Sequence, residues 1–523
     1  MITLTRMLPM RAKTIILALC FAATSLSAEV RLPHTLSDHA VLQREQPVRI
    51  WGWAAVGERV EISFHNQKLS TTADNEGAWQ LWLRPEAAGG PFTLRVTGDH
   101  SAKPLERTDI LVGDVWLASG QSNMEMPLRG FDIPKIKDGE KEIAAATHPE
   151  LRLLVQSKRP AAVELDDTDN TWTLCTPESA REFSAVAYFF ARQISADEKV
   201  PVGIIDTTWG GTPAHAWISQ EGLAWSNLPS VGYDGGVLAR QQGHMNALRA
   251  NHAAQIEAAK AAGSEVPKNL DEIYMWNNGD HAGAWTPSTL FNGMIAPYTR
   301  YAIKGVIWYQ GETDHEGIKA RNYSRVFPAL IEDWRARWAE GTFPFLYVQI
   351  SSYDGGDGWA NVRDAQRRSL KLDKTGMAVT LDIGLPKEVH PPDKQTVAAR
   401  LAAAARAIAY GGHDEYASPL FVRATAEGAA IRAWFSHADG LYSKEATPGD
   451  FEVAGLDGKW FPATAKIEIV NGVVTVVASA DKVASPRSIR YGWTPVVTSF
   501  LYNKAGLPMG TFTSENDAEM MIP

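Results

Sequence analysis

Short, continuous apolar segments alternate with helical segments between residues 109 and 411 of this 523-residue chain. The apolar segments include residues 110–112, 203–205 and 306–308, and the helical ones include residues 185–194, 323–338 and 394–409. Strands that are apolar on both faces are typical of a parallel sheet that is covered by helices. The alternation therefore predicts an α/β domain with a parallel sheet.

The sequence on either side of this domain has a different pattern, in which short alternating strands are separated by turns. Residues 29–108 predict a β-sandwich-like domain, and residues 412–523 predict a second β-rich domain with a loosely ordered end. Within residues 109–411, an Ala-rich helical stretch followed by polar sequence predicts an insertion at about 227–285. Such a division suits the length of the chain, because single domains usually contain about 100–200 residues.

The amino terminus has the order of a secretory signal peptide. Arg6, Arg11 and Lys13 precede an apolar run at residues 14–24, and small residues follow up to Ala28. The run is shorter than the ~20 residues that span a bilayer, and no later segment is apolar for long enough to do so. We therefore expect residues 1–28 to be removed and the mature protein to be exported to the periplasm or the medium, with no membrane as partner.

Composition argues against several partners and cofactors. The formal net charge is −9 and no long Lys/Arg run occurs, so neither nucleic acid nor an anionic membrane is an expected partner. Without the signal peptide, Cys175 is the single cysteine, and its apolar context is typical of a buried small side chain. No Cys/His cluster has zinc-binding spacing, so we expect no metal ion and no cofactor.

Four polar segments follow predicted strands of the α/β domain. They are residues 120–124 with Ser122, residues 209–214 with paired glycines, residues 308–314 with Gln310 and Glu312, and residues 382–394 with His390. Ligands bind at the carboxyl ends of parallel strands, so we expect these loops to open at one edge of the sheet. Ser122 in such a turn is either a nucleophile or a helix N-cap.

Each of the other polar residues also has two interpretations. His390 can act as a base, although the chain has 13 histidines and most single histidines are structural or exposed. Paired glycines allow backbone N–H groups to approach a ligand, or they form an ordinary tight turn. Gln310 can donate to an oxyanion and Glu312 can orient an imidazole, or both cap the helix that follows.

At the same four places the sequence resembles the sialate O-acetylesterase family, a branch of the SGNH hydrolases. The matching blocks are Gly-Gln-Ser-Asn-Met at 120–124, Gly-Gly-Thr-Pro-Ala at 210–214, Trp-Tyr-Gln-Gly-Glu at 308–312 and His-Pro-Pro-Asp-Lys at 390–394. Further similarity, at residues 38–44 and 490–493, extends the resemblance over the mature chain. It implies an SGNH-hydrolase-like, three-layer α/β core that is flanked by β-rich regions.

The resemblance also implies roles for individual residues. Ser122 would be the nucleophile and His390 the general base. The oxyanion hole would combine the backbone N–H of Ser122, the backbone N–H of Gly211 (less favoured, Gly210) and the side chain of Gln310.

The residue that orients the imidazole is left open. Many SGNH enzymes carry an acid three residues before the histidine, where this chain has Lys387. The role then falls to Glu312, Glu388 or Asp382, or to a backbone carbonyl. We favour Glu312, because it belongs to the same block as the expected oxyanion donor.

The resemblance implies a carbohydrate O-acetylesterase that acts on an acetylated sugar or glycan through a serine acetyl-enzyme. We expect tryptophans near the motif loops to contact the sugar: Trp209, Trp217, Trp285 and Trp308. Since His390 must be neutral, activity should fall below its ordinary pKa of ~6.5. The alternatives are an esterase for plant polysaccharide such as xylan or xyloglucan, a lipase- or peptidase-like hydrolase, and a non-catalytic secreted carbohydrate-binding protein.

Overall fold

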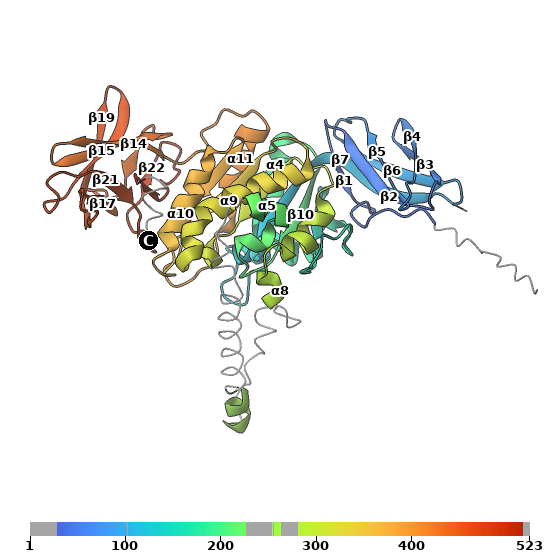
Figure 1. Cartoon of the computed structure of the whole chain (residues 1–523), viewed down its shortest axis with the longest axis horizontal. Helices are drawn as coiled ribbons and strands as arrows, with labels where there is room; N and C mark the ends of the chain where they lie inside the picture. Colours follow the sequence, from blue (N-terminus) through green and yellow to red (C-terminus); the bar gives the residue numbers. More distant parts are fainter. Residues whose placement is uncertain (1–28, 102, 226–253, 255, 263–280, 516–523) are drawn as a thin grey trace, which may run out of the picture.

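A computed structural model of the chain describes residues 29–101, 103–225, 254, 256–262 and 281–515. A central α/β body carries a β-rich region on each side, one built from the start of the chain and one from its end (Figure 1). The expected signal peptide, most of the expected insertion at 227–285, and residues 516–523 lie outside the described residues.

The central sheet has the strand order β13-β12-β11-β7-β10-β8-β9. Neighbouring strands from β13 to β8 are parallel, and β9 pairs with β8 in the antiparallel sense. The strands are β7(Leu105–Gly120), β8(His148–Val155), β9(Thr173–Cys175), β10(Val202–Thr208), β11(Gly305–Tyr309), β12(Phe345–Gln349) and β13(Thr375–Val379). Strands β10 to β13 are buried along their whole length, which explains why they are apolar on both faces.

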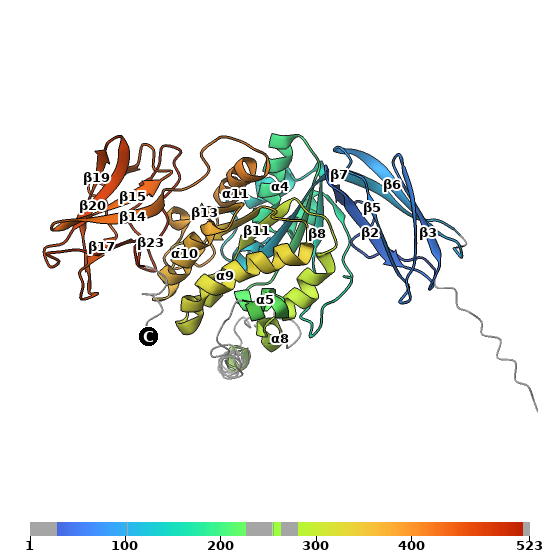
Figure 2. The ribbon, with the colours of Figure 1, turned by 45° about the horizontal axis from the view of Figure 1, so that its top comes forward.

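Helices cover both faces of this sheet (Figure 2). On one face lie α4(Ala185–Glu198) and α11(Lys394–Ala409), and on the other lie α5(Gln220–Trp225), α9(Gly317–Trp338) and α10(Trp359–Arg368). The expected three-layer α/β core is thereby confirmed. Among the described helices, none combines the length and apolar character that a bilayer span requires.

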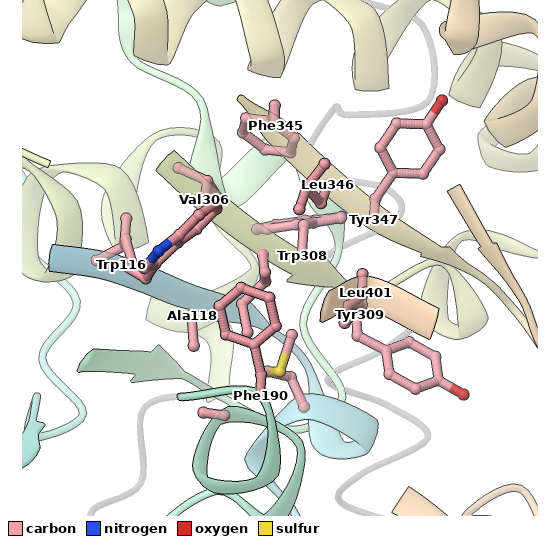
Figure 3. Packing of buried hydrophobic residues seen from close by; sticks show 14 of the residues in the cluster. Trp116, Ala118, Phe190, Val306, Trp308, Tyr309, Phe345, Leu346, Tyr347 and Leu401 are labelled. Carbon is pink, nitrogen blue, oxygen red and sulfur yellow. The ribbon is translucent and has the colours of Figure 1, made fainter. Parts of the chain in front are cut away.

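Large aromatic side chains pack against both faces of the central sheet, and Figure 3 shows part of this packing around Trp116, Phe190 and Trp308. Trp116 of β7 meets Phe190 of α4 edge to face, with ring centroids 5.0 Å apart. Trp308 of β11 points to the other face and stacks on Phe327 of α9 at 6.3 Å. All four side chains are fully buried, so the sheet packs against its helices through large apolar contacts on both faces.

The N-terminal β region joins the core through one strand. Strands β3 and β6 pair with each other, and β6 pairs with the first half of β7, whereas the second half of β7 pairs with β10 and β11. Residue 108, where the sequence suggests a boundary, lies inside this strand. The other strands of the region are β1(Val41–Gln43), β2(Val48–Trp53), β3(Arg59–Phe64), β4(Gln67–Thr72), β5(Ala78–Leu83) and β6(Gly89–Gly98).

The C-terminal β region contains two four-stranded antiparallel sheets, with the orders β14-β15-β20-β19 and β18-β17-β21-β23. Its loops reach the core, where Arg363 of α10 donates to the carbonyl of Thr494 and Ser352 accepts from the N–H of Val497. The strands are β14(Leu420–Glu427), β15(Ala430–Ser436), β16(Tyr442–Ser443), β17(Phe451–Ala454), β18(Trp460–Pro462), β19(Thr464–Val470), β20(Val473–Ser479), β21(Ser488–Tyr491), β22(Leu501–Tyr502) and β23(Phe512–Thr513).

The packing of Phe190 on Trp116 predicts a large cost for its removal. We expect Phe190→Ala to lower the free energy of unfolding of the α/β body by about 3–5 kcal/mol, because a buried phenylalanine leaves a cavity. Leu456→Ala is the control, since that side chain is 88% exposed, and it should cost under about 0.5 kcal/mol. Denaturant unfolding followed by tryptophan fluorescence measures both, and equal losses would contradict this account of the core.

Candidate active site

Three of the four motif loops start side by side at the carboxyl edge of the sheet. In the register of the sheet, Gly120 at the end of β7 lies opposite Thr208 of β10 and Tyr309 of β11. Backbone hydrogen bonds continue beyond the strands, from Gln121 N–H to the Tyr309 carbonyl at 3.0 Å and from Trp209 N–H to the Gly120 carbonyl at 3.0 Å. The segments that carry Ser122, the paired glycines and Gln310 are therefore adjacent.

Ser122 begins the short helix α1(Ser122–Glu125) directly after this strand. Gly120 has φ +136°, and a Cβ there would lie 2.1 Å from the Tyr309 carbonyl oxygen, so only glycine allows so close a turn. The N-cap of α1 is Gln121, whose side chain makes no capping hydrogen bond. Ser122 is thus not the cap, and its hydroxyl is directed elsewhere.

The hydroxyl of Ser122 meets His390, which lies 268 residues further along the chain. His390 Nε2 is 2.8 Å from Ser122 Oγ. On the other side of the ring, His390 Nδ1 is 3.2 Å from Glu388 Oε1, which also accepts the backbone N–H of His390 at 2.9 Å. A proton on Nδ1, on the side of the ring that faces the Glu388 carboxylate, leaves Nε2 free to accept from the serine, as a general base requires.

The three carboxylates proposed from the sequence have different surroundings. Among the described residues, the carboxylate paired with the imidazole is that of Glu388. Glu312, which we favoured, instead accepts the side-chain N–H of Asn123 at 2.5 Å. Asp382 pairs with Arg400 at 2.7 Å. The turn that ends at His390 folds Glu388 back onto the ring, and this places Glu388 where Glu312 was expected.

The structure also shows which of the expected oxyanion donors are already hydrogen-bonded within the protein. The N–H of Gly210 already donates to the carboxylate of Glu125, whereas Gly211, with φ +71°, has no hydrogen-bond partner for its N–H among the described residues. As the first residue of α1, Ser122 has an N–H that no carbonyl of its own helix can accept. These two backbone N–H groups are available to an oxyanion, consistent with the preference for Gly211 over Gly210.

Gln310 does not have the expected orientation. Its side chain is fully buried, and its amide donates to the Thr212 carbonyl at 3.2 Å and to Asp314 at 2.6 Å. Both N–H bonds are therefore in use within the protein. This corrects the expectation that Gln310 donates to the oxyanion: it instead ties the loop after β10 to the loop after β11.

The protonation of His390 is set by its surroundings. Burial, and then the nearby charge of Lys394, lower the pKa of His390 to about 4. Lys394 is itself fully buried, and burial lowers the pKa of its ammonium group to about 7. The sequence could only suggest the ordinary value for an exposed histidine, so the site holds its base neutral over a wider range than expected.

The tryptophans near the motif loops are mostly buried. Trp308 is 0% exposed and packs against Phe327 and Trp334, so the expectation that it contacts sugar is corrected: it is a core residue. Trp217 is likewise fully buried, and Trp209 is only 7% exposed, with Lys158 over its ring. Trp285 is partly exposed and therefore accessible.

Three residues near Ser122 and His390 were assigned no role in the site from the sequence. Asn123 follows Ser122 and Lys394 lies shortly after His390, both inside the matching blocks. Their residue types alone do not show that the two side chains hydrogen-bond to each other. Phe131 packs edge to face on His390 at 5.1 Å, and no motif singled it out. Cys175 is buried as expected, which raises the pKa of its thiol to about 12.

Within the described ranges, no group of three or more His, Cys, Asp or Glu side chains is arranged to hold a metal ion. The polar groups gathered around Ser122 are a base, a carboxylate and backbone donors. This set can activate a hydroxyl and stabilise an oxyanion, which are the requirements of acyl transfer.

Comparisons with known proteins agree with this chemistry. Residues 271–406 match the family described as carbohydrate esterase, sialic acid-specific acetylesterase. Sialate O-acetylesterase from Rattus norvegicus is 32% identical over 438 residues, which cover 76% of this chain and 77% of the relative. The human enzyme is 28% identical over 509 residues, covering 89% and 87% of the two chains.

The fold is similar to that of a solved enzyme as well. The crystal structure of a carbohydrate acetylesterase from Xanthomonas citri superimposes with a TM-score of 0.77 at 35% identity, over 93% of this chain and 100% of that one. Both the sequence similarity and this structural similarity extend well beyond the four motif loops. The chain therefore belongs to the sialate O-acetylesterase family and is a carboxylic ester hydrolase, a carbohydrate acetylesterase.

Proposed function

We propose that this esterase removes O-acetyl groups from sugars through an acetyl-enzyme formed on Ser122. The observation that supports this most directly is the 2.8 Å contact between Ser122 Oγ and His390 Nε2. A nucleophile and a base within hydrogen-bonding distance, with the base held by a third group, are the arrangement required for covalent catalysis.

In the first half-reaction, Ser122 Oγ attacks the acetyl carbonyl carbon while His390 Nε2 takes the hydroxyl proton. The negative charge that develops on the carbonyl oxygen is stabilised by the N–H groups of Ser122 and Gly211. The carboxylate of Glu388 stabilises the imidazolium and fixes its orientation. Collapse of the intermediate breaks the ester bond, and Nε2 returns its proton to the departing sugar oxygen.

In the second half-reaction, a water molecule replaces the sugar. His390 Nε2 takes a proton from this water, whose oxygen attacks the carbonyl carbon of the acetyl group on Ser122. The proton returns from Nε2 to Ser122 Oγ, and acetic acid leaves and releases its remaining proton to the solvent as acetate. The acyl group that the site has to hold is small, and the part of the substrate that leaves first is the sugar.

The proposed substrates are acetylated sugars or glycans. The curated relatives are named for sialate, so O-acetylated sialic acids are the first class to test, and acetylated plant polysaccharides such as xylan and xyloglucan are the second. A secreted carbohydrate-binding protein without turnover has no need for a hydrogen-bonded serine and histidine. The intact pair therefore favours the enzyme over that alternative. A lipase- or peptidase-like hydrolase would prefer longer acyl groups.

We also propose that the enzyme is exported, acting in the periplasm or the medium. This rests on the basic, apolar and small-residue order of residues 1–28. Acetylated glycans outside the cytoplasm would then be within its reach.

The central experiment measures acetate release from a panel of acetylated sialosides and plant polysaccharides. We expect Ser122→Ala to lower kcat at least about a thousandfold, because the acetyl-enzyme can no longer form. Ser179→Ala in α3(Pro177–Arg181) is the control, a helix-start serine whose hydroxyl bonds the backbone, and it should retain activity. Acetate release that survives Ser122→Ala would refute the mechanism. Release from longer aryl esters in preference to aryl acetate would favour the lipase-like alternative.

The pH dependence of kcat/KM provides a second test. His390 acts only when neutral, and its lowered pKa of about 4 means that activity should persist on acidification to about pH 5 and fall by half near pH 4. An uncharged aryl acetate serves as substrate, so that the titration belongs to the free enzyme. A half-point near 6.5, the ordinary value for histidine, would show that burial does not control this group.

A third test distinguishes the candidate orienting acids. Glu388→Gln should lower kcat about tenfold to hundredfold, because the imidazolium of the transition state loses its carboxylate and its fixed orientation. Asp382→Asn should affect the melting temperature more than kcat, since Asp382 pairs with Arg400. Similar kcat values for Glu388→Gln and the parent enzyme would rule out Glu388 as the orienting residue.

A further inference from the structure

A fully buried lysine lies next to the proposed catalytic pair and has no part in the mechanism above. Lys394 is the first residue of α11 and is 0% exposed. Its Nζ donates to Asn123 Oδ1 at 2.5 Å and lies 5.4 Å from the centre of the Tyr309 ring. An ammonium group inside a protein is costly unless it is paired, so this position requires an explanation.

The partner of Lys394, Asn123, joins the two segments that carry the catalytic pair. Its side-chain N–H groups donate to Glu312 Oε1 at 2.5 Å and to the carbonyl of Val389 at 2.9 Å. Asn123 follows Ser122 directly, and Val389 directly precedes His390. One buried amide therefore bonds the residue after the nucleophile to the residue before the base.

Glu312 completes the group. It is 6% exposed, and its Oε2 has no hydrogen-bond partner among the described residues. Burial raises the pKa of Glu312 above its ordinary value, although a backbone hydrogen bond, the hydrogen bond from Asn123 and the charge of Lys394 each lower it. The amide of Asn123 lies between a cation that bonds its oxygen and a carboxylate that bonds its nitrogen. This fixes which way the amide faces, because the reversed amide would place its N–H groups against the ammonium.

We propose that Lys394, Asn123 and Glu312 form a positioning group that holds His390 against Ser122, and that the charge of Lys394 adds to burial in keeping the imidazole neutral. The inference rests on the proposed function of Ser122 and His390. None of the three residues is assigned a contact with substrate: they act through the Val389 carbonyl and through the electrostatic potential at the ring.

The charged groups around both side chains determine the sign of the electrostatic effect. His390 has Glu388 at Nδ1, the Ser122 hydroxyl at Nε2 and the charge of Lys394 nearby. The carboxylates that act on Lys394 belong to Glu312, Glu388 and Asp393. Because the pKa of Lys394 is about 7, it is charged throughout the acid range in which His390 titrates. Removing this charge should therefore raise the pKa of His390 and move the acid limb of activity to higher pH.

The test variant is Lys394→Met, which keeps the length of the side chain and removes its charge. We expect kcat to fall about tenfold to hundredfold, because the base is less well placed, with KM within about twofold. The half-point of the acid limb should rise by up to about one pH unit. Both values come from rates of aryl acetate hydrolysis across pH, and melting temperatures are recorded for each variant.

Lys304→Met is the matched control. Lys304 also lies over a tyrosine ring, that of Tyr410 at 4.9 Å, but it precedes β11 and so lies at the opposite edge of the sheet. Its replacement should leave both kcat and the acid limb unchanged.

A second variant guards against a folding defect. Lys394→Met alone leaves Glu312 as a buried carboxylate without a countercharge, which could prevent folding. The double variant Lys394→Met/Glu312→Gln keeps the site neutral, and it should fold while retaining the upward shift of the acid limb. If the folded variants keep the kcat and the acid limb of the parent, the group is structural only and the inference is overturned.

The inference and the proposed function fail in different ways. Activity that persists in Ser122→Ala would overturn the proposed function, whatever Lys394→Met shows. An inactive Ser122→Ala together with a Lys394→Met enzyme that behaves as the parent would leave the proposed function in place and remove only the positioning group.

Discussion

The site depends on the alignment of strand ends in the central sheet, and β7 is the strand that fixes it. Its last residues are hydrogen-bonded to β10 on one side and β11 on the other, so the loops after the three strands must start at the same level. Its first residues belong to the N-terminal β region. A shift of β7 by one residue would reverse the faces of Trp116 and its neighbours, so the apolar packing on both faces locks the register that places Ser122.

The histidine reaches the serine by a longer route. β13 is separated from β7 by β12 and β11, and three strand spacings of ~4.8 Å amount to about 14 Å. Residues 380–393 cross this distance before α11 starts at Lys394. A loop of this length is not held by sheet hydrogen bonds, so contacts outside the sheet must fix where it ends, such as the hydrogen bond from the Lys137 N–H to the Pro392 carbonyl at 3.1 Å. The bond from Asn123 to the Val389 carbonyl is such a contact, at the residue before His390.

The meeting of Ser122 and His390 at one edge of the sheet could be predicted from the sequence, because the apolar runs show where each strand ends. Continuous apolar runs identified the strands, and parallel strands have a shared carboxyl edge, so Ser122 and His390 could be placed together despite their separation. Glu388 was among the candidate acids but was not preferred, because its position depends on the turn at residues 385–388. Glu312 was favoured because it lies in the same sequence block as Gln310. That position gave no information about whether its carboxylate faces the imidazole or Asn123.

Gln310 and Trp308 show a second limit. A sequence reveals that a side chain can donate or stack, but not whether its partners are inside the protein. Asp314, four residues after Gln310, takes one of its N–H bonds, and β11 turns Trp308 towards α9 and away from solvent. Both residues belong to a motif block, yet Gln310 holds neighbouring loops together and Trp308 packs in the core beneath them. Adjacency to a motif is thus weaker evidence for substrate contact than the face of the strand on which a residue lies.

The charges of Glu388 and Lys394 have opposite effects on the protonation of His390. The charge that is more deeply buried has the stronger effect. Glu388 Oε1 lies 3.2 Å from Nδ1, where a carboxylate favours the imidazolium, but its side chain is 30% exposed and is therefore partly screened by water. Lys394 is fully buried, where the effective dielectric constant is lower and a charge acts over a longer distance. Burial of the ring itself also disfavours the charged form. The resting imidazole is therefore neutral, and in the proposed mechanism the nearby carboxylate would stabilise the imidazolium that forms when the serine proton is transferred.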